Sequence, residues 1–144
     1  MLRLVRMSLI TTFMGVVFLS TGASADVSPL GTWTMGKVTV KVTDCGGGIC
    51  GTIVALKEPI SRIDGKPKVD RENLDESKCQ RPLIGLPVMM GMKPMSGDQW
   101  QGSIYNPDDG RTYNATVKLD GDTMKVQGCV ASIFCKTNNF ARVN

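Results

Sequence analysis

Apolar and polar residues alternate along most of the chain, which is the pattern of β-strands with one buried face. Three valines, at 38, 40 and 42, alternate with lysine and threonine, and residues 111–119 alternate in the same way. No segment has the spacing of an amphipathic helix. The pattern predicts eight short strands, over residues 31–35, 37–43, 50–56, 86–92, 99–105, 111–119, 123–129 and 134–142.

Turn-forming residues separate these segments. Glycine, asparagine and aspartate gather at 35–36, 44–48, 96–98, 106–110 and 120–122, as expected for tight turns. Eight strands joined mostly by such turns predict an all-β fold, a small antiparallel up-and-down barrel. An open sandwich of two sheets is the alternative.

Residues 58–82 interrupt the alternation. They carry six acidic and six basic side chains and no strand pattern. We expect a solvated crossover with one helical turn, capped by Asn73 and with Asp75 and Glu76 in its first turn. A lid over the mouth of the barrel is a compatible alternative, because long connections in compact domains are often functional.

The first 25 residues have the features of a cleavable signal peptide. Arg3 and Arg6 precede an apolar run over 7–19, and Ala23-Ser24-Ala25 forms a cleavage site. A transmembrane anchor is disfavoured because the apolar run is shorter than the roughly 20 residues that a span needs. We therefore expect a periplasmic protein with one domain, residues 26–144.

Five cysteines fit export into an oxidising compartment. Close pairs favour disulfides between Cys45 and Cys50 and between Cys129 and Cys135, with Cys79 free. A bond from Cys50 to Cys129 is the main alternative. Metal binding is disfavoured, because the spacings are long or lack a matching partner pair. We expect a monomer, or a dimer linked through Cys79.

Residues near the two ends of the predicted domain can close the barrel. Gly31 and Trp33 lie in the first strand, while Phe140 and Arg142 lie in the last. The indole would plug one end, and the guanidinium would stack on it while donating to nearby carbonyls. Small barrels of the lipocalin type close one end in this way.

Seven segments spread over the predicted domain keep the order of a known family pattern: residues 31–33, 50–54, 64–67, 73–75, 81–86, 104–113 and 136–142. In these segments the sequence resembles DUF2147, a bacterial family of exported proteins that is grouped with the calycins. The resemblance implies a lipocalin-like barrel and no established activity. Phe140 stands where members often carry tryptophan, and Cys79 lies upstream of the expected family cysteine.

The composition argues against catalysis. The chain has no histidine, which excludes Ser-His-Asp and Cys-His mechanisms and histidine zinc sites. The carboxylates of residues 58–82 alternate with lysine and arginine, as solvated ion pairs do. Residues 106–110 lack the ligand order of a calcium loop and are explained by a turn. We expect no enzyme activity, no cofactor and no metal.

The charge balance argues against nucleic-acid binding. Removal of Arg3 and Arg6 from the 17 basic residues leaves 15, against 13 acidic residues. A nucleic-acid-binding domain concentrates many more basic groups on one face. A small apolar or lipid-like ligand, or a protein of the cell envelope, is the expected partner.

Candidate ligand-binding residues lie near the predicted mouth of the barrel. Arg81 could hold an anionic head group, and Tyr105 and Tyr113 flank the turn at 106–110. Strict alternation puts Met90 and Met92 on one face of their strand. Eight-stranded barrels hold side chains or one small ligand, so we expect non-catalytic binding of an apolar or amphipathic molecule.

Two alternatives to ligand binding remain. A barrel filled by its own side chains would instead serve as a structural or interaction module of the envelope. The methionines at 89, 90, 92 and 95 could also bind Cu(I) through their soft thioethers, although methionine commonly fills barrel interiors.

Overall fold

The computed structural model describes residues 28–144, and the predicted signal peptide lies outside the described residues. Each strand pairs antiparallel with the next, and the last returns to the first, which closes the barrel. The predicted all-β barrel is confirmed, and the open sandwich is wrong. The strands are β1 Gly31–Thr34, β2 Val38–Asp44, β3 Ile49–Leu56, β4 Pro87–Pro94, β5 Gln99–Asn106, β6 Arg111–Asp120, β7 Thr123–Val130 and β8 Phe134–Val143.

Large side chains fill the interior of the barrel. Trp33, Met92 and Met124 are fully buried. Glycines on neighbouring strands leave space for the methionines, since a Cβ on Gly51 would lie 2.6 Å from Sδ of Met89 and one on Gly102 would lie 2.8 Å from Sδ of Met92. Close packing of this kind maximises dispersion contacts. The barrel therefore has a core made of its own side chains.

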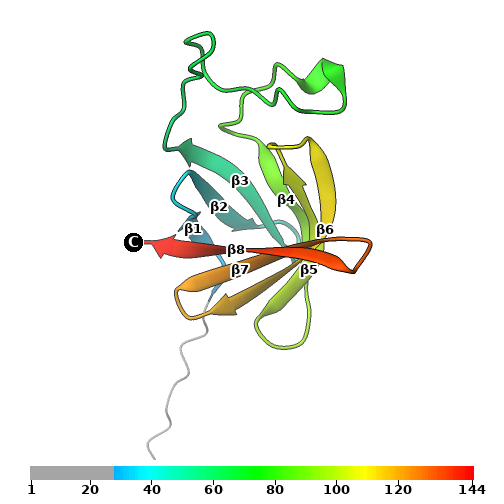
Figure 1. Ribbon diagram of the computed structural model, residues 1–144. Helices are drawn as coiled ribbons and strands as arrows, with labels where there is room; N and C mark the ends of the chain where they lie inside the picture. Colours follow the sequence, from blue (N-terminus) through cyan, green and yellow to red (C-terminus); the bar gives the residue numbers. More distant parts are fainter. Residues whose placement is uncertain (1–27) are drawn as a thin grey trace, which may run out of the picture.

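The two ends of the barrel differ (Figure 1). The long connection between β3 and β4, residues 57–86, lies at one end with the β5–β6 turn, and the chain enters the barrel at the other. A hydrogen bond from Lys57 N to Lys37 O and an ion pair of 3.2 Å between Lys37 Nζ and Asp108 join the β1–β2 turn to the same end. We call residues 57–86 the crossover and this end the crossover end.

Trp33 closes the opposite end. The Arg142 guanidinium carbon lies 4.2 Å from the centroid of the indole ring. Its Nη1 and Nη2 donate to the carbonyl oxygens of Leu30 and Ser28, at 3.1 and 2.7 Å. Gly31 has a φ of +128°, and a Cβ there would lie 3.2 Å from Arg142 Nη1, so the approach favours glycine. Phe140 packs against the core from the same strand as Arg142.

Two disulfides staple hairpins, with the pairing that the sequence favoured. Cys45 bonds Cys50 across the β2–β3 turn, and Cys129 bonds Cys135 near the tip of the β7–β8 hairpin. Cys79 is free and half-buried. Such disulfides are compatible with an exported protein.

The crossover has little regular structure. Two isolated antiparallel bridges, Ile60 to Pro67 and Val69 to Pro82, fold it back on itself. Its one helical turn is a 3₁₀ helix, η1 Glu76–Lys78, capped by Asp75, whose side chain accepts from Ser77 N. The predicted cap at Asn73 is wrong, because the helical turn begins only at Glu76; Asn73 Oδ1 accepts from Asp75 N, before the helix, at 2.8 Å. Within residues 28–144 no helix is long and apolar enough to cross a membrane.

Candidate functional site

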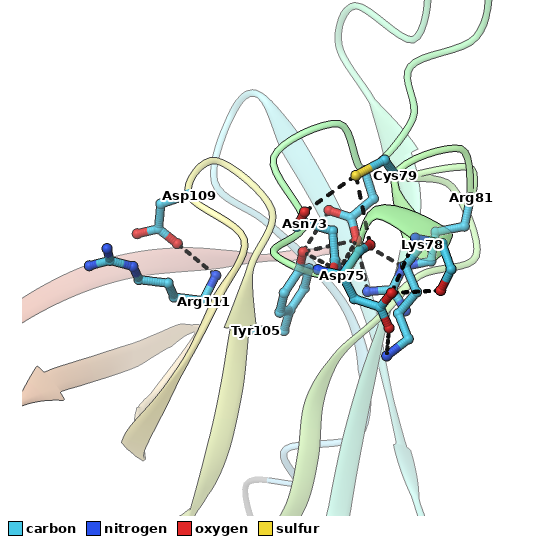
Figure 2. A network of polar contacts seen from close by, with 10 residues as sticks. Asn73, Asp75, Lys78, Cys79, Arg81, Tyr105, Asp109 and Arg111 are labelled. Atoms are coloured by element: carbon cyan, nitrogen blue, oxygen red, sulfur yellow. Dashed lines mark hydrogen bonds and ion pairs between the residues drawn. The ribbon is translucent and has the colours of Figure 1, made fainter.

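A buried carboxylate joins the crossover to the barrel wall. Asp70 is fully buried. Tyr105 Oη donates to it at 2.7 Å, Arg81 Nε at 2.8 Å and Asn73 Nδ2 at 2.8 Å (Figure 2). Asn73 Nδ2 also lies 2.8 Å from Tyr105 Oη. A buried charge is tolerated only when it is paired and hydrogen-bonded, and these three side chains meet that condition for Asp70.

Backbone pairing within the crossover brings Asp70 and Arg81 together. Asp70 N donates to Arg81 O at 2.9 Å, next to the bridge between Val69 and Pro82. The guanidinium therefore reaches the carboxylate with both Nε and Nη2, each 2.8 Å from Oδ2. Burial opposes the charged form of Arg81, but its interactions with Asp70 and Tyr105 outweigh it and raise the pKa of the guanidinium.

Tyr105 is the barrel's contribution to this network. Burial, and then its hydrogen bond to the Asp70 carboxylate, raise the pKa of the phenol above 10.0. The Arg81 guanidinium carbon lies 5.3 Å from the centre of its ring. Tyr105 pairs with the exposed Thr112, whereas its neighbour Ile104 pairs with Tyr113 and approaches Gly128 inside the barrel. Since successive side chains alternate faces, Tyr105 lies on the outer face of the wall.

A cleft of about 330 Å³ lies beside this network. Met90 pairs with Ser103 and so shares the outer face with Tyr105, while the crossover supplies the other wall. The lining contains both polar and apolar side chains. The lining residues are Asn73, Lys78, Arg81, Pro87, Met90, Tyr105, Gly110 and Thr112.

The crossover is held closely against the β5–β6 turn. Gly110 has a φ of +71°, and a Cβ there would collide with the carbonyl oxygen of Glu72. Glycine is required at this position for both reasons. The contact fixes the height of the crossover above the strands, and thereby the width of the cleft.

Lys78 carries a positive charge at the edge of the cleft. Its Nζ lies 2.9 Å from Asp75, and about half of each side chain is exposed. Hydrogen bonds from Ser77 and Lys78 lower the pKa of Asp75 to about 2. The carboxylate is thus charged at neutral pH, and it partly balances the lysine.

A second hollow, of about 600 Å³, lies between the β5–β6 turn and the β7–β8 hairpin, with Leu74, Tyr113 and Val130 in its lining. Tyr113 Oη donates to Asp109 at 2.6 Å. That bond raises the pKa of Tyr113. Burial works to raise the pKa of Asp109, but the bond from Tyr113 and others outweigh it and lower that pKa. The hollow is broad, and the Tyr113 hydroxyl already donates its hydrogen bond to Asp109 in the turn.

The structure places the predicted ligand residues at different sites. Arg81, Tyr105 and Met90 meet at the cleft, whereas Tyr113 lines the second hollow. The prediction that Met92 lies with Met90 is wrong, because Met92 is fully buried in the core.

A bulge explains the separation. The β4–β5 ladder shifts register between Met90 and Lys93, where Gly91 has a φ of +58°. A bulge adds one residue to a strand and reverses the alternation beyond it. Met89 and Met92 therefore both enter the core, while Met90 and Met95 are partly exposed.

Six residues of the cleft and its network were not predicted as ligand residues: Asp70, Asn73, Lys78, Pro87, Gly110 and Thr112. Asp70 was expected to be solvated, which is wrong. The available signal was weak: Val69 precedes Asp70, and Pro82 follows Arg81, so each charge has an apolar neighbour. Among residues 28–144, no three His, Cys, Asp or Glu side chains gather as metal ligands.

Comparison with known sequences gives the family. The pattern of a family described as "Uncharacterized protein conserved in bacteria (DUF2147)" matches residues 31–142. The chain belongs to the DUF2147 family. The match extends from the first residue of β1 to Arg142 in β8, so all of the barrel except Val143 lies within it, together with the crossover and the cleft. No curated protein matches the sequence.

A solved structure has the same fold. It is described as "Protein HP1028 from the human pathogen Helicobacter pylori belongs to the lipocalin family". The two chains are 17% identical, with 82% of this chain and 84% of that one covered and a TM-score of 0.69. At this identity the likeness establishes a lipocalin-like barrel and no more.

Proposed function

We propose that this DUF2147 protein is a non-catalytic binding protein of the periplasm that holds a small amphipathic anion in the cleft beside Tyr105. The observation that carries the proposal is the composition of the cleft. Lys78, Arg81 and Asn73 line it together with Met90 and Pro87. Binding sites commonly combine an apolar surface with a few convergent polar groups.

Arg81 can bind a ligand while it remains paired with Asp70. A guanidinium has five N–H donors, and its contacts with Asp70 use Nε and Nη2. Within residues 28–144, the side-chain hydrogen bonds of Arg81 leave Nη1 unused, and 36% of the side chain is exposed. The buried carboxylate orients the guanidinium, so that Nη1 is presented with little loss of side-chain entropy on binding.

The apolar part of the ligand would lie on Met90 and Pro87. Met90 is 38% exposed on the outer face of β4. A flexible thioether adapts to apolar groups of different shapes. A cleft of about 330 Å³ is at the small end of the range of ligand sites, which favours a single alkyl chain or a small ring over a larger ligand.

A titration with dodecanoate and dodecyl phosphate tests the proposal, by calorimetry and by NMR shifts of the residues in the cleft. We expect binding by the parent and loss of binding by Met90→Asp. Met95→Asp is the matched control, because Met95 is 48% exposed and lies outside the cleft lining. Equal binding by parent and Met90→Asp would contradict the proposal, as would failure of the parent to bind either probe.

A second pair of variants tests the anionic part of the ligand. Lys78→Gln should weaken binding of dodecyl phosphate by about tenfold, equivalent to about 1.4 kcal/mol. Lys125→Gln removes a lysine of similar exposure that pairs with Asp120 at 2.8 Å and should bind as the parent does. Dodecanol, which lacks the charge, should bind the parent and Lys78→Gln equally, and it should bind the parent more weakly than dodecyl phosphate does.

The packed interior supports a second candidate function, an interaction module of the cell envelope. Buried side chains that include Trp33, Met92 and Met124 form one cluster in the described part of the chain, as they would in a barrel without internal cargo. Cross-linking in intact cells would distinguish the two functions. Capture of one envelope protein, together with no binding of the amphipathic probes, would favour the module.

Periplasmic placement has its own test. The two disulfides and the bacterial family support it, together with the predicted signal peptide. Cell fractionation should find the protein in the periplasm, and sequencing of its N-terminus should begin at Asp26. A cytoplasmic protein that retains residues 1–25 would contradict this assignment.

A further inference from the structure

Strand β8 has an unpaired edge. It pairs with β7 from Phe134 to Ala141, but with β1 only from Ala141 to Val143. Within residues 28–144, no strand pairs with the other edge of β8 from Phe134 to Phe140. The β7–β8 hairpin extends past the rest of the barrel at the right of Figure 1.

The backbone groups that face this edge can be assigned from the ladder. Arg142 N donates to Asp122 O, next to the first residue of β7, at 3.0 Å. Since the groups of successive residues point to opposite sides of a strand, Cys135, Thr137 and Asn139 direct their N–H and C=O groups away from β7. In the described part of the chain, these three residues make no backbone hydrogen bond toward that side.

Common protective features are scarce on this edge. Native proteins block edges with bulges, prolines and charged side chains. The β7–β8 register is continuous, and residues 134–139 contain one charge, that of Lys136, and no proline. The adjoining tip is apolar, with Ile133 77% and Phe134 75% exposed. The edge therefore resembles a docking surface for an extended strand.

We propose that this edge pairs antiparallel with the same edge of a second copy of the chain, with Thr137 on the two-fold axis. Thr137 then lies opposite Thr137 of the second copy, Cys135 opposite Asn139, and Lys136 opposite Asn138. The outward N–H and C=O groups of both copies are paired at once. The contact is self-complementary and closed, as a two-fold interface requires.

Charge selects this register. Opposed threonines stabilise a strand pair, whereas like charges directly opposite destabilise it. Centring the contact on Lys136 would oppose two lysines, but centring it on Thr137 opposes each lysine with an asparagine. The Thr137 register also uses the whole free segment from Cys135 to Asn139 and stops where β1 begins to pair. The dimer needs no bond through Cys79, since the contact is made by the backbone.

Cross-linking tests the geometry. Thr137→Cys in a Cys79→Ser background should form a disulfide-linked dimer on mild oxidation, because directly opposite residues lie about 5.5 Å apart at Cα, within disulfide range. Gln127→Cys in the same background is the matched control. Gln127 pairs with Thr137 on β7 and contacts its hydroxyl at 3.3 Å, so it shares the face but lies one strand from the edge and should stay monomeric.

Sedimentation or light scattering tests the same contact without a new thiol. The parent should dimerise as concentration rises, and Thr137→Lys should weaken dimerisation at least tenfold, while Gln127→Lys should not change it. Thermal melts check that both variants fold. A parent that stays monomeric up to about 1 mM would overturn the proposal. Equal cross-linking at positions 127 and 137 would also overturn it, as would an edge occupied only by a strand of another protein.

Discussion

Arg142 lies over Trp33, with the guanidinium carbon 4.2 Å from the ring centroid, and two of its nitrogens donate to carbonyl oxygens of the entering chain. The indole nitrogen donates to Pro29 O at 2.9 Å. The contact thus joins β8, β1 and the segment before β1. It is the point at which the barrel closes on itself, because β1 and β8 pair over only three residues.

Arg142→Ala should lower the free energy of unfolding by about 1–3 kcal/mol, because both the stacking and the carbonyl partners are lost. Arg142→Lys should recover part of the loss, since it keeps the charge but not the planar fork. Urea melts measure both. Lys125→Ala, at an exposed ion pair, should cost less than about 1 kcal/mol. Equal stability of Arg142→Ala and the parent would refute the role of the contact.

Asp70→Ala should destabilise the protein by about 3–5 kcal/mol, the cost of leaving a partly buried partner charge unpaired. The double variant Asp70→Ala/Arg81→Leu should recover much of this loss, since no charge is then left alone. Urea melts of the single and double variants measure the coupling. Asp108→Ala, which breaks an exposed pair with Lys37, is the control and should cost less than about 1 kcal/mol. Additive losses at Asp70 and Arg81 would contradict the coupling.

Gly110→Ala should destabilise the protein more than Gly121→Ala. Both glycines have positive φ, but only Gly110 faces a backbone atom that a Cβ would strike. Gly121→Ala should cost about 1–2 kcal/mol for the left-handed conformation alone. Gly110→Ala should cost about 3 kcal/mol or more, because the crossover must also move. Equal losses in urea melts would show that the Glu72 contact does not restrain the crossover.

The chain has two tyrosines, and the pKa of each is raised, that of Tyr105 by burial and then by Asp70, and that of Tyr113 by Asp109. Absorbance at 295 nm should therefore show tyrosinate forming above pH 10 in the native protein. A raised folded pKa means that the native state holds the proton more tightly. The contribution of each tyrosine to stability is complete below the pKa of the unfolded chain, about 10. It is lost as pH rises through the higher pKa of the folded protein.

The variants Tyr105→Phe and Tyr113→Phe assign the two transitions. Each leaves one phenol to titrate, and Tyr105→Phe should reduce the fall in stability above pH 10. A native titration with the midpoint of an unfolded chain would contradict both hydrogen-bonded environments.

Local patterns were sufficient to predict the barrel. The alternation at Val38, Val40 and Val42 requires one buried face, and glycine-containing turns require hairpins, so strand after strand pairs with its neighbour. The two disulfides follow from the same locality, because each joins residues across one turn. Closure at Trp33 and Arg142 was also predictable. An indole in the first strand and a guanidinium in the last can stack where the two strands meet.

The bulge in β4 could not be predicted from such local patterns. Alternation assigns Met90 and Met92 to one face, but Gly91 takes a positive φ and the register shifts. Whether a glycine in a strand becomes a bulge depends on what the neighbouring strands bury. Here the space beside Gly51 and Gly102 admits Met89 and Met92 together, and Met90 is left outside to line the cleft.

By itself the sequence determined the order of the strands, the hairpins, and the residues that close one end, because each depends on periodicity or on neighbours along the chain. Only the tertiary structure decided that Asp70 is buried, and that Arg81, Asn73 and Tyr105 are its partners. Tyr105 lies 35 residues from Asp70 in sequence. The apolar residue before Asp70 does not distinguish it, because Asp64 and Asp75 also follow apolar residues. Its burial depends on the crossover folding back across β5, where a charge is stable only because three donors meet it.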